Sequence, residues 1–417
     1  MLRPPRGVLT SRHKVLFISL AALLVLSLLY SRSSYRSSRP PLPHPLISLT
    51  STPQRVNTTL GPTLWSLVRQ SHPPSAIRVH LPLSEDGIAP TSLPSSDAVY
   101  RHPLVQIVYV EDEGPATKFY PSIRAAFELA KAENDLSPLL SPIVVVDDDH
   151  LYSPVLVETL VRAWEERGRE AAVALRGWRV RRDLRWGVGG GWEEVRRHVV
   201  EGWRVSRGYR VGVITANEGY LITPSFFLSP SLRFSSFSLS SSLSPSQKLS
   251  LLPSPSSLPF FFPPSSSAPE SLHLVDDILL SGSLAQSLIP RFVVPLCAEP
   301  GPPSVDITPP SRTEEEKAGG PRSPLEHHLA EHGKSRGEAN DEALAYFGAA
   351  FAAERDDEGG EGSLWYDMRS VEERRADGNR GEPQWKGWAG RTWSEVSKWA
   401  FYTRARRVWG GQRVVWN

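Results

Sequence analysis

The chain has 417 residues, which is enough for one large domain or two ordinary ones. Its formal net charge is only +2, so no excess of positive charge points to nucleic acid as a partner. It contains a single cysteine, Cys297, which excludes an intramolecular disulfide and a zinc site built from cysteines.

The N-terminus carries an uncharged apolar segment at residues 15–30, VLFISLAALLVLSLLY. It is slightly shorter than the roughly 20 residues that cross an average bilayer, and basic residues flank it on both sides. Because no small-residue cleavage site follows it, an uncleaved signal anchor is favoured over a cleaved signal peptide. We therefore expect a cytosolic tail at 1–14, a transmembrane anchor at 15–30 and a Ser-, Arg- and Pro-rich stem at 31–45.

This arrangement predicts a single-pass type II protein of the Golgi or endoplasmic reticulum membrane, with the rest of the chain in the lumen. A short span suits the thinner bilayers of the early secretory pathway. The sequon Asn57-Thr58-Thr59 is compatible with a lumenal location, because glycosylation acceptors lie on that side.

Strands and helices are expected to alternate from residue 46 onward. Short apolar or alternating segments predict strands at 46–49, 77–81 and 105–110, and apolar residues at helical spacing predict helices at 58–68 and 122–132. Strands that alternate with helices of about a dozen residues indicate βαβ units. The fold class is therefore α/β, with a mostly parallel sheet flanked by helices.

The β-branched run at 143–146, IVVV, is typical of a central parallel strand, and the acidic triplet Asp147-Asp148-Asp149 follows it directly. A helix at 155–167 and a strand at 171–175 are expected next. Ser153 and Pro154 would supply an N-cap and a first-turn proline for that helix.

The pattern changes at residue 228. Residues 228–270 are rich in Ser, Pro and Leu and almost uncharged, which indicates a disordered insertion or intron sequence retained in the coding sequence. The remaining segments are an ordered stretch at 272–288, a strand at 291–295, a polar linker at 299–322, a helix at 339–353 and a Gly-, Arg- and Trp-rich tail at 357–417 that the pattern does not assign. One domain is expected over 46–356.

The acidic triplet is the strongest chemical signal. In open α/β sheets, ligands bind at the carboxyl ends of the strands, which is where the triplet lies. Three adjacent carboxylates repel one another unless a cation is bound, and Mn²⁺ or Mg²⁺ prefers oxygen ligands and bridges to phosphate oxygens.

Successive residues of an extended chain point in opposite directions, so not all three can bind the metal. One carboxylate could instead hold a nucleotide ribose. The alternative is a cap for the next helix, which Ser153-Pro154 makes unnecessary.

Other charged residues are ambiguous from local pattern alone. Asp276-Asp277 fits an exposed helix start, where acids suit the helix dipole, or a catalytic base at Asp277. Lys118, after Gly114-Pro115, would neutralise a diphosphate or be simply solvated, and Arg55 is similar. His150 is interpreted as a polar neighbour of the triplet rather than as a ligand.

Several segments together resemble GT-A glycosyltransferase domains. The matching segments are LISLTSTPQR, LWSLVRQSHPPSAIRVHLP, GPATKFYPSI, VVVDDDHLYSP, ALRGW, EGYLITPSFF, the stretch from VDDILLSGSLA to IPRFVVP, and Arg336 to Phe347. They occur in the expected order over 46–227, 270–296 and 334–352. The insertion at 228–270 departs from the pattern.

The resemblance implies a GT-A (Rossmann-like) fold, a nucleotide-diphosphate sugar donor, and Mn²⁺ or Mg²⁺ held by the DXD-type run. Asp147 and Asp149 would hold the metal, and Asp147 would also contact the nucleotide. Asp148, Lys118 and Arg55 would contact the donor. Asp277 would be the base if the reaction inverts configuration.

The sequence therefore predicts a membrane-anchored, metal-dependent glycosyltransferase that acts on a glycan or protein acceptor. One alternative is a nucleotidyltransferase or metal phosphohydrolase that uses the same carboxylates. A nucleotidyltransferase usually has a Gly-rich basic loop near its first strand, and residues 50–55 contain none. The other alternative is a non-catalytic anchored scaffold, with the Ser/Pro-rich insertion and the Trp-rich tail as binding segments.

Overall fold

The computed structural model describes residues 41–83, 93, 97–180, 198–228, 233, 269–296, 304–307 and 333–351. The chain divides into two compact units, Met1–Leu42 and Pro43–Asn417, and every described helix and strand belongs to the second. The predicted cytosolic tail, the anchor at 15–30, most of the stem and of the insertion, Cys297 and the tail at 357–417 lie outside the described residues. Within the described part of the chain, no helix combines the length and apolar character needed to cross a membrane.

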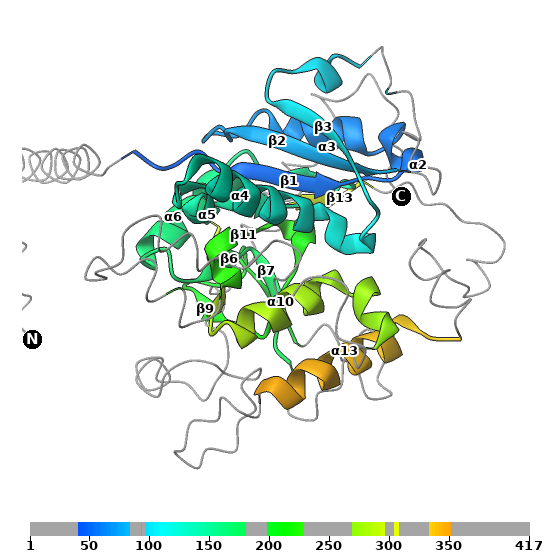
Figure 1. Ribbon diagram of the computed structural model, residues 1–417, viewed down its shortest axis with the longest axis vertical. Coiled ribbons are helices and arrows are strands. Elements are labelled where there is room, and N and C mark those ends of the chain that lie inside the picture. Colours follow the sequence, from blue (N-terminus) through cyan, green and yellow to red (C-terminus); the bar gives the residue numbers. More distant parts are fainter. Residues whose placement is uncertain are drawn as a thin grey trace, which may run out of the picture. The chain divides into compact units, whose positions relative to one another are not determined.

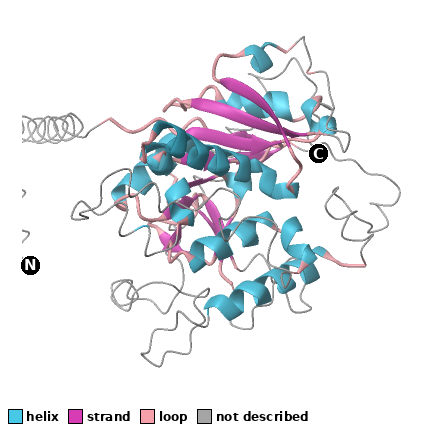
Figure 2. Cartoon of the chain, viewed as in Figure 1, coloured by secondary structure: helices cyan, strands magenta, loops and turns pink. Residues whose placement is uncertain are grey.

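The main sheet has eight strands in the order β3-β2-β1-β4-β11-β6-β12-β9 (Figures 1 and 2). In its first half, β1, β2, β3 and β4 are all parallel, with Leu46 of β1 opposite both Ala76 of β2 and Ile143 of β4. The strands of the main sheet are β1 (Leu46–Thr50), β2 (Ala76–Pro82), β3 (Val105–Val110), β4 (Ile143–Val145), β6 (Ala172–Ala174), β9 (Tyr209–Arg210), β11 (Tyr220–Ile222) and β12 (Arg291–Val293).

The second half of the main sheet is mixed. Strand β11 runs antiparallel to β4 and β6, β12 is parallel to β6, and β9 is antiparallel to β12. The prediction of a mostly parallel sheet is therefore confirmed for β1–β4, while the chain adds antiparallel pairs beyond them. Parallel strands need a crossover connection, which α-helices supply between β1 and β2 and between β3 and β4. Between β2 and β3 the described residues form only a 3₁₀ turn, Ala98–Arg101.

Two smaller sheets were not expected from the sequence. One has the order β10-β7-β8, made by Val213–Ile214, Arg176–Trp178 and Val199–Glu201. The other pairs β5 (His150–Tyr152) with β13 (Ser304–Asp306), so a strand lies inside the segment that the sequence suggests is a polar linker.

The helices cover the sheet and form a separate pair. Helix α4 crosses one face of the sheet in front of β1 in the view of Figure 1, and α13 lies beside α10. The α-helices are α2 (Pro53–Val56), α3 (Leu60–Leu67), α4 (Tyr120–Glu133), α5 (Ser137–Leu140), α6 (Leu156–Glu166), α10 (Asp276–Gln286) and α13 (Arg336–Phe351). The 3₁₀ turns are η1 (Ala98–Arg101), η2 (Gly114–Lys118), η3 (Ala216–Glu218), η4 (Pro224–Phe227) and η6 (Glu270–Leu274).

Helix α6 begins later than the sequence suggests. Val155 occupies its N-cap position and makes no side-chain cap, so the N-cap lies two residues after the predicted Ser153. Ser153 Oγ accepts a hydrogen bond from the Val155 amide at 3.4 Å, in the turn that precedes the helix. Glu158 lies in that first turn, where an acidic side chain suits the helix dipole, and it pairs with Arg162 at 2.8 Å.

Candidate donor and metal site

The acidic triplet lies at the carboxyl end of β4, as the sequence predicts. Because β1 and β4 are parallel, their carboxyl ends reach the same edge of the sheet, and Ser51 follows β1 there. Val144 and Val145 are fully buried, so the strand fixes the point at which the three carboxylates leave the core. This edge is the usual ligand-binding edge of an open α/β sheet.

The middle carboxylate, Asp148, points into the protein and is only 3% exposed. It accepts hydrogen bonds from Ser51 Oγ at 2.5 Å and from Arg55 Nη1 at 2.6 Å, and its backbone carbonyl accepts one from Thr63 Oγ1 at 2.9 Å. Burial raises the pKa of Asp148 to about 6, against the opposing effect of Arg55. These contacts fix Asp148 to residues that follow β1 and to α3. The contact between Asp148 and a donor stays a prediction.

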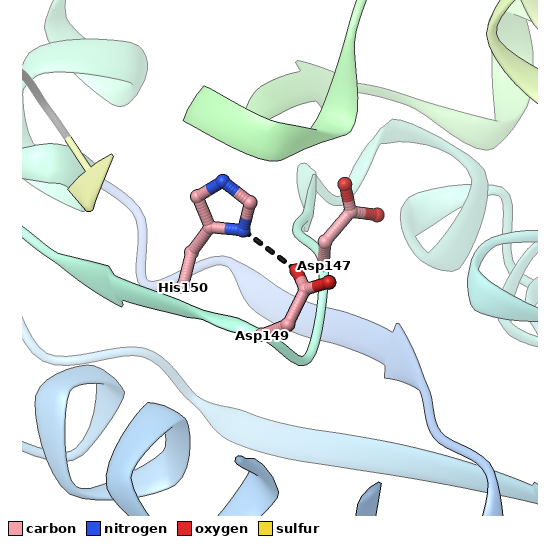
Figure 3. A group of neighbouring side chains, drawn as sticks. All are labelled: Asp147, Asp149 and His150. Atoms are coloured by element: carbon pink, nitrogen blue, oxygen red, sulfur yellow. Dashed lines mark hydrogen bonds and ion pairs between the residues drawn. The ribbon is translucent and has the colours of Figure 1, made fainter. Parts of the chain in front are cut away.

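The two outer carboxylates are more open than Asp148. The side chain of Asp147 is 26% exposed and that of Asp149 is 14% exposed. Together with His150 they offer three ligand atoms that lie within 4.8 Å of one another. Figure 3 shows the His150 ring facing the Asp149 carboxylate, and Nδ1 lies 2.7 Å from Asp149 Oδ1. The structure therefore groups His150 with the outer carboxylates, a placement that its local sequence pattern did not favour.

Hydrogen bonds from neighbouring elements fix the backbone of the triplet. The Tyr152 hydroxyl accepts from the Asp147 amide at 2.9 Å and donates to the Asp147 carbonyl at 3.1 Å. The Ile307 amide, at the end of β13, donates to the Asp149 carbonyl at 2.8 Å. Burial lowers the pKa of His150, but its hydrogen bond to Asp149 and the neighbouring carboxylates raise that pKa above the ordinary value. The backbone of residues 147–149 is thus hydrogen-bonded both to Tyr152 of β5 and to Ile307, which follows β13.

Lys118 connects the triplet to a second acidic group. Its ammonium lies 2.6 Å from Asp147 Oδ1 and 2.8 Å from Asp276 Oδ2, and the residue is only 7% exposed. Although burial alone lowers the pKa of Lys118, the surrounding carboxylates raise it well above its ordinary value, so the side chain stays charged. The partnership with Asp276 was missed by the sequence analysis, because 158 positions separate the two residues and no local pattern reports such a contact.

Asp277 lies beside this cation and stands next to Asp276 at the start of α10. Its Oδ1 accepts a hydrogen bond from the Ala216 amide at 3.2 Å. Burial and the adjacent Asp276 charge raise the pKa of Asp277 to about 8. The two acids begin α10, as the helix-start interpretation predicts, but Asp276 is buried there and not exposed. The role of Asp277 as a base stays a prediction.

The charges in this region do not balance. Its ionisable groups include five carboxylates, from Asp147, Asp148, Asp149, Asp276 and Asp277, two cations, Arg55 and Lys118, and the imidazole of His150. Ionised carboxylates at this spacing raise one another's pKa values and destabilise the fold unless protons or cations neutralise them. A divalent cation is the simplest neutralising group, and two carboxylates with one imidazole form a donor set that suits Mn²⁺.

Comparison of the chain with protein-family models and with curated protein sequences finds no match. Among solved structures, it is similar to TarS of S. aureus, at 12% identity and a TM-score of 0.27, over 45% of this chain and 29% of that chain. A second is the mannosyltransferase PcManGT from Pyrobaculum calidifontis, solved with GDP-Man and Mn²⁺, at 14% identity and a TM-score of 0.25, over 94% and 97% of the two chains.

A third similar structure is mouse xyloside xylosyltransferase 1 in its apo form, at 16% identity and a TM-score of 0.19, over 34% of this chain and 55% of that chain. The chain thus spans less than a third of the length of TarS and about half of that of the mouse enzyme. The mixed central sheet with flanking helices is compatible with the GT-A fold that the resemblance of the sequence implies. These similarities are distant, and the chemistry proposed below rests on the side chains of this chain.

Proposed function

We propose that the chain is a metal-dependent glycosyltransferase that uses a nucleotide-diphosphate sugar. The observation that carries the proposal is the cluster at the carboxyl end of β4, where Asp147, Asp149 and His150 converge beside the buried cation of Lys118. Diphosphate donors need positive charge at their phosphates and a metal to bridge them. A cluster that offers both kinds of contact fits that substrate class.

The metal would be Mn²⁺ or Mg²⁺, held by Asp147 and Asp149 with His150 as the third ligand. The donor set fits because carboxylate oxygens suit both ions and an imidazole nitrogen adds a preference for Mn²⁺. When bound, the cation would supply Lewis-acid stabilisation to the leaving diphosphate. Arg55 lies 3.2 Å from Asp149 Oδ2 and would keep that carboxylate oriented.

Lys118 would contact the donor phosphates. Its ammonium now lies between two carboxylates, so binding of the donor would exchange a carboxylate partner for a phosphate oxygen without moving the charge far. Asp276 would keep the side chain near the site during that exchange. A lysine that reached the phosphates from an exposed position would lose more side-chain entropy than one that is already buried.

Asp277 would be the base that removes the proton from the acceptor hydroxyl. Its raised pKa makes the ionised carboxylate a stronger base than an ordinary Asp, which suits proton abstraction near neutral pH. The nearby Lys118 charge opposes the rise and favours the ionised form. This role belongs to a reaction that inverts configuration.

We also propose that residues 15–30 anchor the chain in the Golgi or endoplasmic reticulum membrane, with the catalytic part in the lumen. The support is the apolar segment itself and the sequon at Asn57, which is exposed at the end of α2. The acceptor would then be a glycan or protein of the secretory pathway.

The proposal is tested by incubating the full-length chain with Mn²⁺ and a panel of UDP- and GDP-sugars, with thermal unfolding and product analysis as the readouts. A true donor at 100 times its dissociation constant stabilises the fold by about 2.7 kcal/mol. Transfer must release nucleoside diphosphate; pyrophosphate would indicate a nucleotidyltransferase, and inorganic phosphate a phosphohydrolase. Absence of any metal-dependent shift would favour the scaffold.

The matched variants are Asp149→Asn and Glu133→Gln. Asp149→Asn removes one negative charge from the metal set and should abolish transfer while the protein stays folded. Glu133→Gln makes the same chemical change on the exposed end of α4 and should leave transfer unchanged. Full activity of Asp149→Asn would refute the proposed metal site.

A further inference from the structure

Three buried polar side chains contact one another beneath helix α4. Ser48 on β1 and His80 on β2 are fully buried, and Ser122 on α4 is 1% exposed. Ser48 Oγ and Ser122 Oγ lie 2.8 Å apart, and Ser122 Oγ lies 3.3 Å from His80 Nε2. The strand register places His80 opposite Thr50, so Ser48 and His80 project from the same face of the sheet.

Two members of this polar cluster contact one turn, η2. Ser48 Oγ donates to the carbonyl of Lys118 at 2.6 Å, and His80 Nδ1 lies 3.3 Å from the carbonyl of Thr117. A carbonyl only accepts, so Nδ1 carries the proton and Nε2 accepts the single hydroxyl proton of Ser122. Because Ser48 gives its own single proton to the Lys118 carbonyl, the 2.8 Å contact between Ser48 and Ser122 carries no proton in this tautomer. The Thr117 hydroxyl in turn accepts from the Glu113 amide at 2.8 Å and closes the start of the turn.

A buried polar group is costly unless it is hydrogen-bonded, and the contacts of Ser48 and His80 with turn η2 meet that requirement. The consequence of the polar choice is that two consecutive carbonyls, of Thr117 and Lys118, are fixed by side chains from two different strands. Such a fixed backbone sets the direction in which the Lys118 side chain leaves the turn.

We propose that Ser48 and His80 are positioning residues that hold turn η2 so that the Lys118 ammonium stays between Asp147 and Asp276. The inference rests on the proposed function only for what Lys118 does with a donor. The polar cluster acts through the backbone of the turn and touches no substrate. Ser122 donates to Nε2 of His80 and keeps the ring in one tautomer.

The first measurement concerns Lys118 itself and needs no substrate. Full-length wild type, Ser48→Ala, His80→Leu and His80→Asn are treated with an amine-acetylating reagent, and modification of each lysine is followed by mass spectrometry. Lys131, exposed on α4, is the internal reference. We expect Lys118 to be acetylated roughly tenfold faster, relative to Lys131, in Ser48→Ala and His80→Leu, because each variant loses a hydrogen bond that fixes the turn.

His80→Asn is the conservative variant. Asparagine Nδ2 occupies nearly the position of histidine Nδ1 and can still donate to the Thr117 carbonyl, so Lys118 should remain protected. Ser287→Ala is the matched control for Ser48→Ala, because it removes another fully buried serine hydroxyl, at the far end of α10. Unchanged protection of Lys118 in folded Ser48→Ala and His80→Leu would overturn the proposal, as would equal exposure in Ser287→Ala.

The second measurement is Mn²⁺-dependent binding of inorganic pyrophosphate, by calorimetry, as a probe of diphosphate recognition. Ser48→Ala should weaken it roughly tenfold, yet have no further effect in a Lys118→Met background, since its action passes through Lys118. Additive losses would contradict positioning. Absence of pyrophosphate binding by wild type, with Lys118 deprotected in Ser48→Ala, would refute the proposed donor site and leave the positioning role standing.

Discussion

The buried His80 makes the fold sensitive to acid, and the sign of the effect is fixed by its surroundings. Burial is the main cause that lowers the pKa of His80 to about 3, and the charges of Arg78 and Arg124 lower it further. In the unfolded chain a histidine titrates near 6.5. The unfolded state therefore binds the proton first, so stability is complete above about pH 6.5 and falls as the pH drops from there toward 3.

The size of this effect follows from the difference between the two pKa values. Linkage from an unfolded pKa near 6.5 and a folded pKa of about 3 gives a loss of about 2 kcal/mol at pH 5 and about 4 kcal/mol at pH 3, both relative to pH 8. For a folded region of this size, about 2 kcal/mol corresponds to a fall in the melting temperature of roughly 4–8 °C. His80→Asn removes the titrating ring and keeps a donor for the Thr117 carbonyl, so it should remove this part of the acid sensitivity.

Urea unfolding of wild type and His80→Asn at pH 8, 7, 6 and 5, with a metal chelator present, measures the effect directly. The two proteins should lose different amounts of unfolding free energy between pH 8 and pH 5, with wild type losing about 2 kcal/mol more. His80→Gln, which also cannot titrate in this range, should behave like His80→Asn in slope. Parallel pH profiles for wild type and both variants would refute the assignment of a neutral, buried His80.

Three further predictions concern other parts of the molecule. Lys118→Met leaves Asp147 and Asp276 without their shared cation, so the free energy of unfolding, measured in urea with a chelator present, should fall by up to about 3 kcal/mol. An unchanged urea midpoint would contradict the ion-pair geometry. Gly282→Ala would place a Cβ 2.3 Å from the Phe347 ring, so it should displace α13 from α10 and lower the free energy of unfolding by about 1–3 kcal/mol. This loss should shrink in a Phe347→Leu background, and strict additivity in the double variant would argue against the contact. Asn57→Gln should abolish the gel-mobility shift caused by N-glycosidase treatment of protein made in a secretory host; absence of a shift in wild type would count against the lumenal location.

The first half of the fold follows from local sequence patterns. Strands β1 to β4 and helices α3 and α4 have apolar periods that are complete within each segment, so the sequence places them to within a few residues. The four-residue helices α2 and α5 are too short to show such a period, and the sequence does not predict them. The β5–β13 pair does not behave in this way. Each of these strands has three residues, and the two are brought together across more than 150 positions, so neither contains enough local pattern to predict the other.

The candidate site shows the same division between local and long-range information. Alternation along an extended chain predicts that Asp148 points away from Asp147 and Asp149, and the structure places it inward on Ser51 and Arg55. The pairing of Lys118 with Asp276 depends on how α10 packs against η2, which is set by tertiary contacts alone. The acidic pair and the lysine are each ambiguous in isolation, and the contact between Lys118 and Asp276 supports the proposal that they belong to one site.

The triplet and the polar cluster beneath α4 achieve positioning by the same physical means. Asp148 is a buried charge that holds the loop between Asp147 and Asp149, and His80 is a buried neutral ring that helps to hold the turn of Lys118. Each would be costly inside an apolar core, and each is instead hydrogen-bonded to groups on other elements. Hydrogen bonds constrain direction as well as distance, whereas apolar contacts tolerate sliding. In the proposed site the outer carboxylates would hold a metal and the Lys118 ammonium would contact the donor phosphates, and both would depend on that directional constraint.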